Sequence, residues 1–478
     1  MAPFFAGNSC DPFTPKETPC TLGKLINFAI NVSEPADIAK GIAFATDNNI
    51  RLVVRNTGHD YNGKSTGAGA LGIWVHNLKD ISFPDYSSPG YTGKAIKMGA
   101  GVQGFEASSA ANASGLTVTG GECPTVGLVG GYTQGGGHSP LSSKYGMAAD
   151  QALEWEVVTG EGKLVTASPT ENADLYWALS GGGGGTYGVV YSLTSKAHEG
   201  LVTSGANLTF ASEGIDDDTY WAAISAFHDI LPSIVDAGGV CEWALSPEAF
   251  VLVPFSGPGI PASKASELFR PLVDRLHKLN VTYKMEGPKD FPTYLDMFDE
   301  FVGDNQEIGT SQYGGRIIPR SVVVDNNKGF TNTLRELMEG PGNNVSFFNV
   351  ALNVNKSLER GTQDADNAVN PAFRDALIEV VVETPWNSTA PLSDMLDQQK
   401  RMTEMYIPKL EAITPGSGTY LSESDPNQPK WQEALYGANY PRLLSIKQKY
   451  DPNDIFYALQ AVGSEGWEAD IGGKLCKT

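Results

Sequence analysis

The stretch GHDYNGKSTG, at residues 58–67, has residue types and spacings that could do chemistry in two unrelated ways. Residues 58–65 match the phosphate-loop pattern GxxxxGK[ST], and residues 63–67 match the nucleophile-elbow pattern GxSxG with Ser65 as the nucleophile. Both patterns require a helix to begin directly after this loop. A glycine-rich run and then a strand-like segment follow Ser65 instead, so the sequence argues against a nucleotide hydrolase and against a serine hydrolase.

Two other kinds of site are also disfavoured by spacing. Residues 183–188 spell GxGxxG, but they follow an expected helix and precede an expected strand, which reverses the order of the dinucleotide-binding fingerprint. A conventional Rossmann site is therefore not expected. The six histidines and five cysteines contain no HxxxH and no CxxC spacing, so we predict no metal site.

Three segments share a high glycine content, at residues 55–69, 119–146 and 180–188. Glycine lets backbone amides approach a ligand closely, and successive amides can form a concave anion site. Three such loops could wrap a long cofactor that carries a pyrophosphate; tight turns between short strands are the alternative. His59 and Cys123 lie inside these loops as potentially reactive side chains, although a lone histidine or cysteine is more often structural.

The totals limit the class of protein. A chain of 478 residues exceeds what one hydrophobic core usually supports, which favours two domains or one domain with an insertion. The formal charge of −21 argues against nucleic acid and anionic membranes as partners, because both require clustered Lys and Arg. No apolar run approaches the length that crosses a bilayer, and the start of the chain does not resemble a signal peptide, so we expect that any such peptide has been removed or replaced.

Several features favour a secreted glycoprotein. Cys10 and Cys20 lie close together in a proline-rich segment, where a disulfide would tie down the N-terminal end. Cys241 and Cys476 are either structural thiols or a pair. N-x-[ST] sequons, which are acceptors for glycosylation, occur at Asn31, Asn112, Asn207, Asn280, Asn344, Asn355 and Asn387.

The order of expected elements indicates an α+β protein. Residues 33–49 have helical spacing after a cap-like serine, residues 50–56 read as a buried strand, and residues 154–168 read as a hairpin. The alternation of strand and helix is too irregular for a doubly wound sheet. From about residue 200 the helices become longer and glycine runs fewer, which indicates a second domain.

The glycine-rich segments resemble, in order and spacing, the berberine-bridge-enzyme-like branch of the vanillyl-alcohol-oxidase flavoprotein superfamily, and most of all its secreted fungal members. The resemblance spans nearly the whole chain. It is carried by RNTGHDYNGKST, GGECPTVGLVGGYTQGGGHSPLSSKYGMAAD, SGGGGGTYGVV and, at residues 436–456, YGANYPRLLSIKQKYDPNDIF. Two departures bear on the substrate rather than the fold: NTGHD stands where many relatives have Gly-Gly-His, and His138 stands where others often carry a bulky apolar residue.

This resemblance implies a PCMH-type FAD-binding domain at residues 1–200 and a substrate-binding domain at residues 201–425, with an antiparallel sheet covered by helices. It implies that residues 426–478 return to the FAD-binding domain. It also implies FAD held by two covalent bonds, from His59 to the 8-methyl carbon and from Cys123 to the 6-carbon of the flavin. Imidazole and thiolate are nucleophiles well suited to an electron-poor ring.

The resemblance further assigns residues to the cofactor. Those expected along the pyrophosphate are Arg55, Asn56, Thr57, Gly58, Asp60 and Ser65, with backbone around Gly127, Gly130 and Gly131. Tyr145, Gly146 and Asp150 are expected to extend the cofactor-binding wall beyond the pyrophosphate. Gly188 and Val190 match the strand beside the adenine, and Asn439 and Tyr440 match residues that contact the flavin from the C-terminal segment.

The reaction implied is a two-electron oxidation of an alcohol, a carbohydrate or a secondary metabolite. A base takes a proton from a hydroxyl or phenol, hydride passes to the flavin, and dioxygen reoxidises the flavin to give hydrogen peroxide. A dehydrogenase or oxidative cyclase with poor oxygen reactivity, or a module that binds flavin without turnover, are the alternatives. We expect a monomer that binds a small molecule and dioxygen, with Tyr436, Tyr440 or His138 as the base and Arg316, Asn353 and Arg374 as candidate pocket walls; ring packing is the alternative role for the tyrosines.

Overall fold

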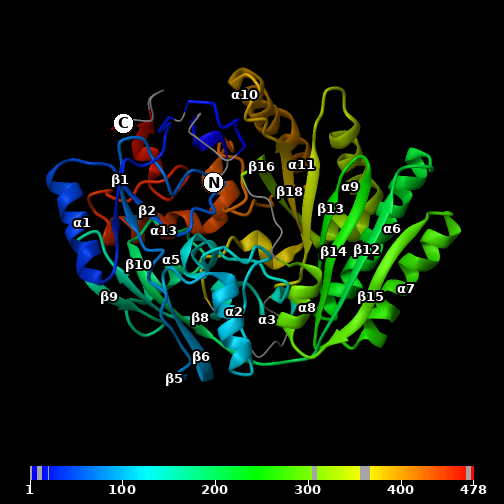
Figure 1. The fold of residues 1–478 in the computed structure, drawn as a ribbon, viewed down its shortest axis with the longest axis horizontal. Coiled ribbons are helices and arrows are strands. Elements are labelled where there is room, and N and C mark those ends of the chain that lie inside the picture. The colour runs from blue at the N-terminus through cyan, green and yellow to red at the C-terminus, as the bar shows by residue number, and fades with distance from the viewer. Residues whose placement is uncertain (1–2, 8–12, 20, 304–308, 356–365, 470–474) are drawn as a thin grey trace.

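The computed structural model describes residues 3–7, 13–19, 21–303, 309–355, 366–469 and 475–478. The expected disulfide between Cys10 and Cys20 lies outside these residues. Two halves lie side by side, one built on short strands and glycine-rich loops and the other on a large sheet with long helices (Figure 1). The protein therefore has the expected α+β fold. None of the described helices is long and apolar enough to span a membrane.

The first half contains a parallel sheet of order β1-β3-β2 and an antiparallel sheet of order β4-β6-β10-β8-β9, with β5 also paired to β6. Its strands are β1 Phe28–Asn31, β2 Leu52–Arg55, β3 Leu71–Trp74, β4 Ile81–Ser82, β5 Asp85–Ser88, β6 Tyr91–Gly99, β7 Leu116–Thr117, β8 Ala152–Val158, β9 Leu164–Ala167, β10 Val189–Lys196 and β11 His198–Glu199. Its helices are α1 Pro35–Asp47, α2 Gly104–Ala113, α3 Ser142–Tyr145, α4 Ala148–Gln151 and α5 Ala173–Leu179, with a π-helical turn, η2, at Leu128–Tyr132.

Local sequence accounts for these elements. Helix α1 begins with proline at its first position, and its N-cap is Glu34 rather than the expected Ser33. Ser33 contributes through its hydroxyl and amide, which both donate to Asp37. The expected hairpin at residues 154–168 is present as β8 and β9.

The second half is a seven-stranded antiparallel sheet of order β15-β12-β14-β13-β17-β18-β16. Its strands are β12 Thr203–Ala211, β13 Val240–Leu245, β14 Ala249–Pro258, β15 Tyr283–Phe291, β16 Ser311–Pro319, β17 Ser346–Ala351 and β18 Ala376–Pro385. Its helices are α6 Asp217–Asp236, α7 Ala262–Lys278, α8 Tyr294–Phe301, α9 Arg320–Glu339, α10 Leu392–Arg401 and α11 Ile407–Ile413, with a 3-10 turn, η3, at Pro371–Asp375.

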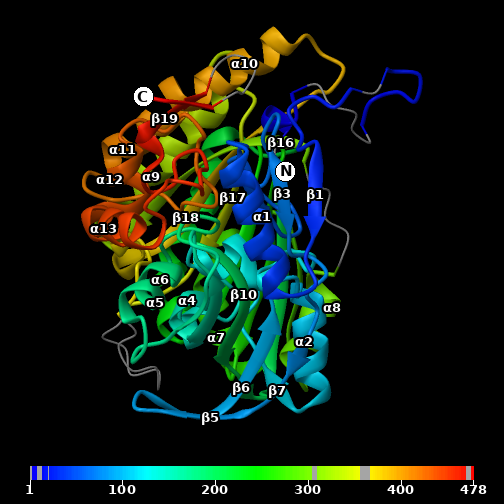
Figure 2. The same cartoon turned by 90° about the vertical axis from the view of Figure 1, so that its left-hand side faces the viewer.

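One face of this large sheet is covered by α6, α7 and α9, and the other faces the first half of the molecule (Figures 1 and 2). Alternate side chains of each strand separate the two faces, since successive residues of a strand point in opposite directions. In β13, Cys241 and Trp243 pack beneath the helices, while Glu242 and Ala244 point toward the first half. Cys241 and Cys476 are both free thiols, one buried and one exposed, so they do not form a pair.

The C-terminal segment lies against the first half. Its elements are α12 Trp431–Tyr436, α13 Tyr440–Tyr450, β19 Trp467–Ala469 and β20 Leu475–Lys477. Helix α13 packs against α5, and Phe456 forms a parallel bridge with Leu52 of β2. The segment therefore shares the hydrophobic core of the first half.

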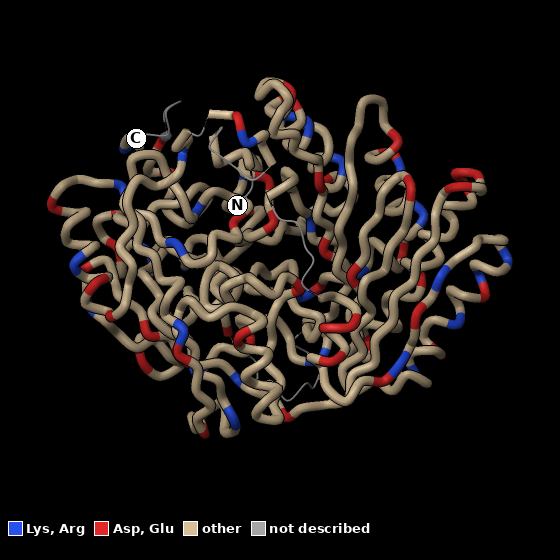
Figure 3. Tube along the Cα trace, in the orientation of Figure 1, with Lys and Arg blue, Asp and Glu red and all other residues tan. Residues whose placement is uncertain are grey.

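Charge is spread over both halves rather than gathered on one face. Lys and Arg alternate with the more numerous Asp and Glu along the trace of the described residues (Figure 3). Asp and Glu outnumber Lys and Arg in the sequence, 55 to 34, and no long run of Lys and Arg is seen along the trace in this view.

Candidate functional site

A cavity of about 590 Å³ lies between the glycine-rich loops of the first half and the exposed face of the large sheet. This volume is within the range of small-molecule and cofactor pockets, about 300–1,000 Å³. Residues 54–65, 121–138 and 184–190 form the loop side, strands β13, β14, β16, β17 and β18 contribute the sheet side, and residues 420–423 close one edge. Every part of the chain that the glycine pattern singled out therefore meets at one site.

His59 and Cys123 both line this cavity, and both side chains approach the hydroxyl of Thr125. The Nε2 atom of His59 lies 2.8 Å from Thr125 Oγ1, and the Sγ atom of Cys123 lies 3.6 Å from the same oxygen. Burial lowers the pKa of His59 to about 4, so its imidazole is neutral at ordinary pH. Two potential nucleophiles, 64 residues apart in sequence, thus face the same space.

The first glycine-rich loop is shaped by its own side chains. The Asp60 carboxylate accepts from the amides of Ser65, at 2.6 Å, and Asn62, at 2.9 Å. Gly58 has a φ of +90°, a conformation that glycine adopts without strain. The segment after Ser65 contains no helix before β3 begins at Leu71, which confirms the prediction that it is not a phosphate loop of the nucleotide-hydrolase type.

Glycines bring the second loop against the first. A Cβ atom at Gly127 would lie 2.7 Å from the Asn56 side chain, and one at Gly130 would lie 2.9 Å from it, so a side chain at either position would displace the Asn56 amide. At Gly131 the same test meets no atom within 4 Å, so there the backbone borders open space. This is the cradle in which the backbone could approach a flat or pyrophosphate-bearing cofactor.

Lys64 is a residue that motif reasoning discarded together with the phosphate-loop pattern. It lines the cavity, and its Nζ is buried and makes no hydrogen bond to any described residue. Burial lowers its pKa to about 8, against the opposing charge of Asp60. An unpartnered cation in a glycine-rich wall suits a phosphate-bearing ligand.

Most of the predicted cofactor residues border the cavity, and several do not. Those that line it are Asn56, Thr57, Gly58, His59, Asp60, Ser65, Cys123, Gly127, Gly130, Gly131, Gly188 and Val190, together with the catalytic candidate His138. Those absent from the lining are Arg55, Tyr145, Gly146, Asp150, Asn439, Tyr436 and Tyr440. Arg55 is close behind the first loop, where its Nη1 donates to the carbonyl of Ser65.

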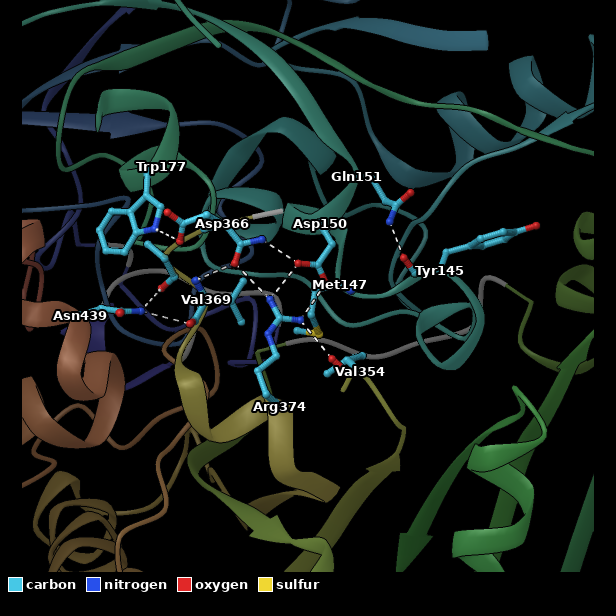
Figure 4. Close-up of polar contacts among 12 residues, drawn as sticks. Tyr145, Met147, Asp150, Gln151, Trp177, Val354, Asp366, Val369, Arg374 and Asn439 are labelled. Carbon is cyan, nitrogen blue, oxygen red and sulfur yellow. Dashed lines mark hydrogen bonds and ion pairs between the residues drawn. The ribbon is translucent and has the colours of Figure 1, made fainter. Parts of the chain in front are cut away.

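Asp150 has a structural partner instead of a place on the wall. Arg374, in η3 of the second half, donates to both of its carboxylate oxygens, at 2.8 and 2.9 Å, and Asn367 donates to one of them (Figure 4). Asp150 is in α4 of the first half, so this buried ion pair joins the two halves. Although burial alone would raise the pKa of Asp150, the Arg374 charge holds it below its ordinary value.

The other residues outside the lining are similarly engaged. Tyr145 stacks on His198 with ring centroids 3.8 Å apart, and Gly146 ends α3 with a φ of +91°. Asn439 donates to the carbonyls of Ala368 and Val369 (Figure 4). Of the candidate pocket walls, Arg316 donates to Thr414 and Asn353 donates to Asp236, so neither lies at the cavity.

The structure does not support Tyr436 or Tyr440 as the base. The Tyr436 hydroxyl is buried and donates to the carbonyl of Gln460 at 2.9 Å, and the Tyr440 hydroxyl donates to Glu465 at 2.6 Å. Burial raises the pKa of both phenols above the ordinary value. Neither hydroxyl faces the cavity; the tyrosines that line it include Tyr132 and Tyr420.

His138 is the catalytic candidate that does lie at the cavity, and it is surrounded by carboxyl groups. Its Nδ1 is 3.3 Å from Glu122, and its Nε2 is 3.1 Å from Glu423 and 3.8 Å from Glu379. Glu242 completes the group through its contact with Glu122. We call His138, Glu122, Glu242, Glu379 and Glu423 the His138 cluster.

Strand register explains how Glu242 and Glu379 reach this cluster. Glu242 of β13 pairs with Val350 of β17, and Val350 pairs with Glu379 of β18, so the two glutamates stand level on one face of the sheet. Motif reasoning missed both because they lie 137 positions apart in the sequence. A usable signal was present: each is an acidic residue with apolar neighbours on both sides in a strand, in VCEWAL and in LIEVV.

Burial and neighbouring charges set the protonation of the His138 cluster. Burial lowers the pKa of His138, but Glu122 and Glu423 together raise it well above its ordinary value. Burial and the adjacent carboxylates raise the pKa of Glu242 and of Glu379. For Glu122, burial is outweighed by the charge of His138, and its pKa is lowered. These two shifts favour the ionised form of Glu122 and the protonated form of His138.

Comparison with known proteins agrees with this architecture. A family model described as an FAD binding domain matches residues 27–168, and one described as berberine and berberine like matches residues 419–463. The FAD-linked oxidoreductase ZEB1 of Gibberella zeae is 45% identical over 482 residues, covering 100% of this chain and 83% of that protein.

Solved structures give the same result. The VAO-type flavoprotein MtVAO615 of Myceliophthora thermophila C1 superposes with a TM-score of 0.93 at 40% identity, over 99% of this chain and 86% of that one. Glucooligosaccharide oxidase of Acremonium strictum, which carries a 6-S-cysteinyl, 8α-N1-histidyl FAD, superposes with a TM-score of 0.75 over 92% of both chains at 18% identity, a likeness of fold.

The chain belongs to the berberine-bridge-enzyme-like branch of the vanillyl-alcohol-oxidase family of flavoproteins. It is an FAD-dependent oxidoreductase, as the resemblance predicted. The glycine-rich wall of the cavity, with the open space beside Gly131 and the unpartnered Lys64, fits this cofactor.

Proposed function

We propose that the protein is an oxidase that removes two electrons from a hydroxyl-bearing small molecule, using FAD bound covalently to His59 and Cys123. The observation that carries this proposal is that His59 and Cys123 both line the cavity and that His59 Nε2 and Cys123 Sγ approach the same Thr125 hydroxyl. The doubly attached FAD of the Acremonium oxidase, which has the same fold, supports it. When bound, the flavin supplies a hydride acceptor that dioxygen can reoxidise to give hydrogen peroxide.

The protein's own residues would hold and deprotonate the substrate. The His138 cluster is the ionisable end of the cavity, and Glu122, whose Oε1 makes no hydrogen bond to a described residue, can accept a proton from a hydroxyl there. His138 would orient that carboxylate and stabilise its charge. This replaces Tyr436 and Tyr440 in the role of base.

The sheet side of the cavity favours an apolar substrate skeleton over a sugar chain. Its lining is dominated by Ala244, Val251, Val253, Phe348 and Val381, and no tryptophan is among the described residues that line it. A sugar oligomer would need an open groove with many hydroxyl partners. We therefore infer an alcohol or phenol of secondary metabolism as the substrate class.

The test is anaerobic reduction of the purified protein by a panel of alcohols, phenols and oligosaccharides. We expect an alcohol or phenol with an apolar skeleton to bleach the flavin absorbance, and admission of air to restore it with release of one hydrogen peroxide per flavin. A flavin that dithionite reduces but no member of the panel bleaches would indicate a binding module. Restoration by an artificial electron acceptor but not by air would indicate a dehydrogenase.

We also propose that the protein acts outside the cell. The support is its acidic charge and the sequons, of which Asn31, Asn280, Asn344 and Asn387 have exposed side chains. These positions are open to the glycosylation machinery of the secretory route.

A further inference from the structure

Three side chains of the His138 cluster come together as a set of metal-ligand atoms. His138 follows the glycine-rich turn after η2, Glu379 is in the middle of β18, and Glu423 lies in the C-terminal edge loop of the cavity. One nitrogen or oxygen from each lies within 4.8 Å of the other two, with Nε2 at 3.1 Å from Glu423 and 3.8 Å from Glu379. Spacing in the sequence gave no hint of this set, because its members are 241 and 44 residues apart.

These distances match the size of a small cation. Zinc binds histidine nitrogen and carboxylate oxygen at about 2.0–2.2 Å, which places tetrahedral ligand atoms about 3.3 Å from each other. The two distances measured from His138 Nε2, 3.1 and 3.8 Å, lie on either side of that value. All three atoms lie within 4.8 Å of one another, so the set must contract to bind one ion at these distances.

The surroundings of Glu379 also indicate a bound ligand, independently of the distances from His138. It is 1% exposed, and neither of its carboxylate oxygens has a hydrogen-bond partner among the described residues. Glu423 Oε2 is likewise buried without a partner in the described part of the chain. Buried carboxylates are normally paired, hydrogen-bonded or metal-bound. Within the described residues, the only side chain in ion-pair range of either carboxylate is His138.

The imidazole is held as metal-binding histidines usually are. Such a histidine commonly presents one ring nitrogen to the metal and the other to a carboxylate, which fixes its tautomer and orientation. Here Nε2 faces Glu379 and Glu423, while Nδ1 faces Glu122 at 3.3 Å. Glu122 therefore occupies the place of that second-nitrogen partner, and Glu379 and Glu423 face the nitrogen that would bind a metal.

We propose that His138, Glu379 and Glu423 bind one divalent cation, with zinc the best match to one nitrogen and two carboxylate donors. Three protein ligands leave a fourth position open, as in catalytic rather than structural zinc sites. His138 and Glu423 line the cavity, so the open position faces the space assigned to the substrate. Resting on the proposed function, the cation would bind the substrate's hydroxyl oxygen and make its proton easier to remove by Glu122.

The alternative arrangement of the same groups is free of metal. Glu379 and Glu423 would then share a proton, as would Glu122 and Glu242, and the imidazole would carry the only positive charge of the cluster. The two arrangements differ in metal content and in the response to chelators, and not in whether flavin is bound.

The experiment is elemental analysis of the flavin-loaded protein, purified without chelators or an affinity metal. We expect about one zinc per chain, removal of that zinc by prolonged dialysis against a chelator with the flavin absorbance retained, and uptake of one Co²⁺ with visible absorption bands of low-symmetry coordination. Yellow protein that contains less than a tenth of an equivalent of metal and takes up no Co²⁺ would overturn the site and leave the proposed function standing. Colourless protein that contains about one zinc per chain would support the metal site and overturn the proposed function.

Matched variants separate a built site from adventitious metal. Glu379→Gln removes a ligand, and Glu383→Gln alters a cavity-lining glutamate four residues along the same strand that is not a ligand. We expect Glu379→Gln to lose at least nine-tenths of the metal and Glu383→Gln to keep it, both with flavin bound. Equal metal in both variants would contradict the proposal. If Glu379→Gln fails to fold, Co²⁺ uptake by the unaltered protein, at one equivalent or none, still decides.

Discussion

Thr125 shows how much of the site depends on single side chains. It lies two residues after Cys123, and its hydroxyl contacts both the sulfur of that residue and the imidazole of His59. The imidazole is neutral because burial lowers its pKa to about 4, so its nitrogen lone pair is available for bond formation. The two residues proposed to attach the flavin thus already lie close together in this structure.

The base assignment can be tested by a pair of substitutions. Glu122→Gln removes the ionised carboxylate of the His138 cluster, and we expect flavin reduction by substrate to slow by about 10²–10⁴-fold, the usual contribution of a general base. Tyr436→Phe removes a hydroxyl that only donates to Gln460, and we expect turnover to change by less than about 3-fold, with about 1 kcal/mol lost in stability. Rapid-mixing reduction kinetics and thermal unfolding measure both effects.

The two substitutions, Glu122→Gln and Tyr436→Phe, distinguish between the two candidate bases. Should Tyr436→Phe abolish flavin reduction while the protein stays folded and yellow, the tyrosine would be the base and Glu122 would not. Flavin content must be measured in Glu122→Gln, since Glu122 is adjacent to Cys123 and could affect attachment.

At the scale of elements, close contact between the two glycine-rich loops is required for the cavity wall. Gly127→Ala would place a methyl group 2.7 Å from Asn56, whose amide also donates to Ala100. We expect a loss of about 1–3 kcal/mol in the free energy of unfolding, as for other overpacked sites, together with reduced flavin incorporation. Gly466→Ala is the control, because no atom lies within 4 Å of a Cβ built there. Equal unfolding temperatures for the two variants would contradict this view of the loops.

The ion pair between α4 and η3 makes stability depend on pH. The pKa of Asp150 is lowered by Arg374 below the ordinary value of 3.8, so its stabilising effect is complete above pH 3.8 and is lost as the pH falls through the lowered value. Arg374→Ala would leave a buried carboxylate without its partner, and we expect about 3–5 kcal/mol of destabilisation at neutral pH that shrinks in acid. Chemical unfolding at several pH values measures this. If the difference in free energy of unfolding between the unaltered protein and Arg374→Ala grew on acidification, the assigned ion pair between Asp150 and Arg374 would be contradicted.

The sequence predicted the loop side of the cavity better than the sheet side. The glycine-rich loops could be recognised in the sequence, because close approach of the backbone to a ligand requires glycine. They correctly located His59, Cys123 and most of the loop side of the cavity. The sheet side could not be read in the same way, since Glu242 and Glu379 meet only through the register of β13, β17 and β18. Tyr436 and Tyr440 were assigned from a matching motif, but hydrogen bonds to Gln460 and Glu465, further along the chain, hold their hydroxyls away from the cavity.

At the scale of the whole molecule, the cavity exists only because the two halves face each other. The loops form one wall of the cavity, the large sheet forms the other, and residues 420–423 supply Glu423 at the edge between them. The buried pair of Asp150 and Arg374 joins the halves near this site. Separating the halves would therefore destroy the site and not merely open it.

The proposed secretion gives a second prediction at this scale. In a eukaryotic secretory host we expect glycans at the exposed sequons Asn31, Asn280, Asn344 and Asn387 before the half-buried Asn207, because the acceptor side chain must be accessible. Peptide mapping after enzymatic deglycosylation identifies the modified positions. Retention of the protein inside the cell without any glycan would contradict it.

The most direct test of the account is the colour and mass of the acid-precipitated protein. We predict a yellow pellet whose intact mass exceeds that of the chain by one FAD, with colour retained in His59→Ala or in Cys123→Ala and lost only when both residues are replaced. A colourless pellet from the unaltered protein, or a mass equal to that of the chain alone, would show that His59 and Cys123 do not hold the flavin.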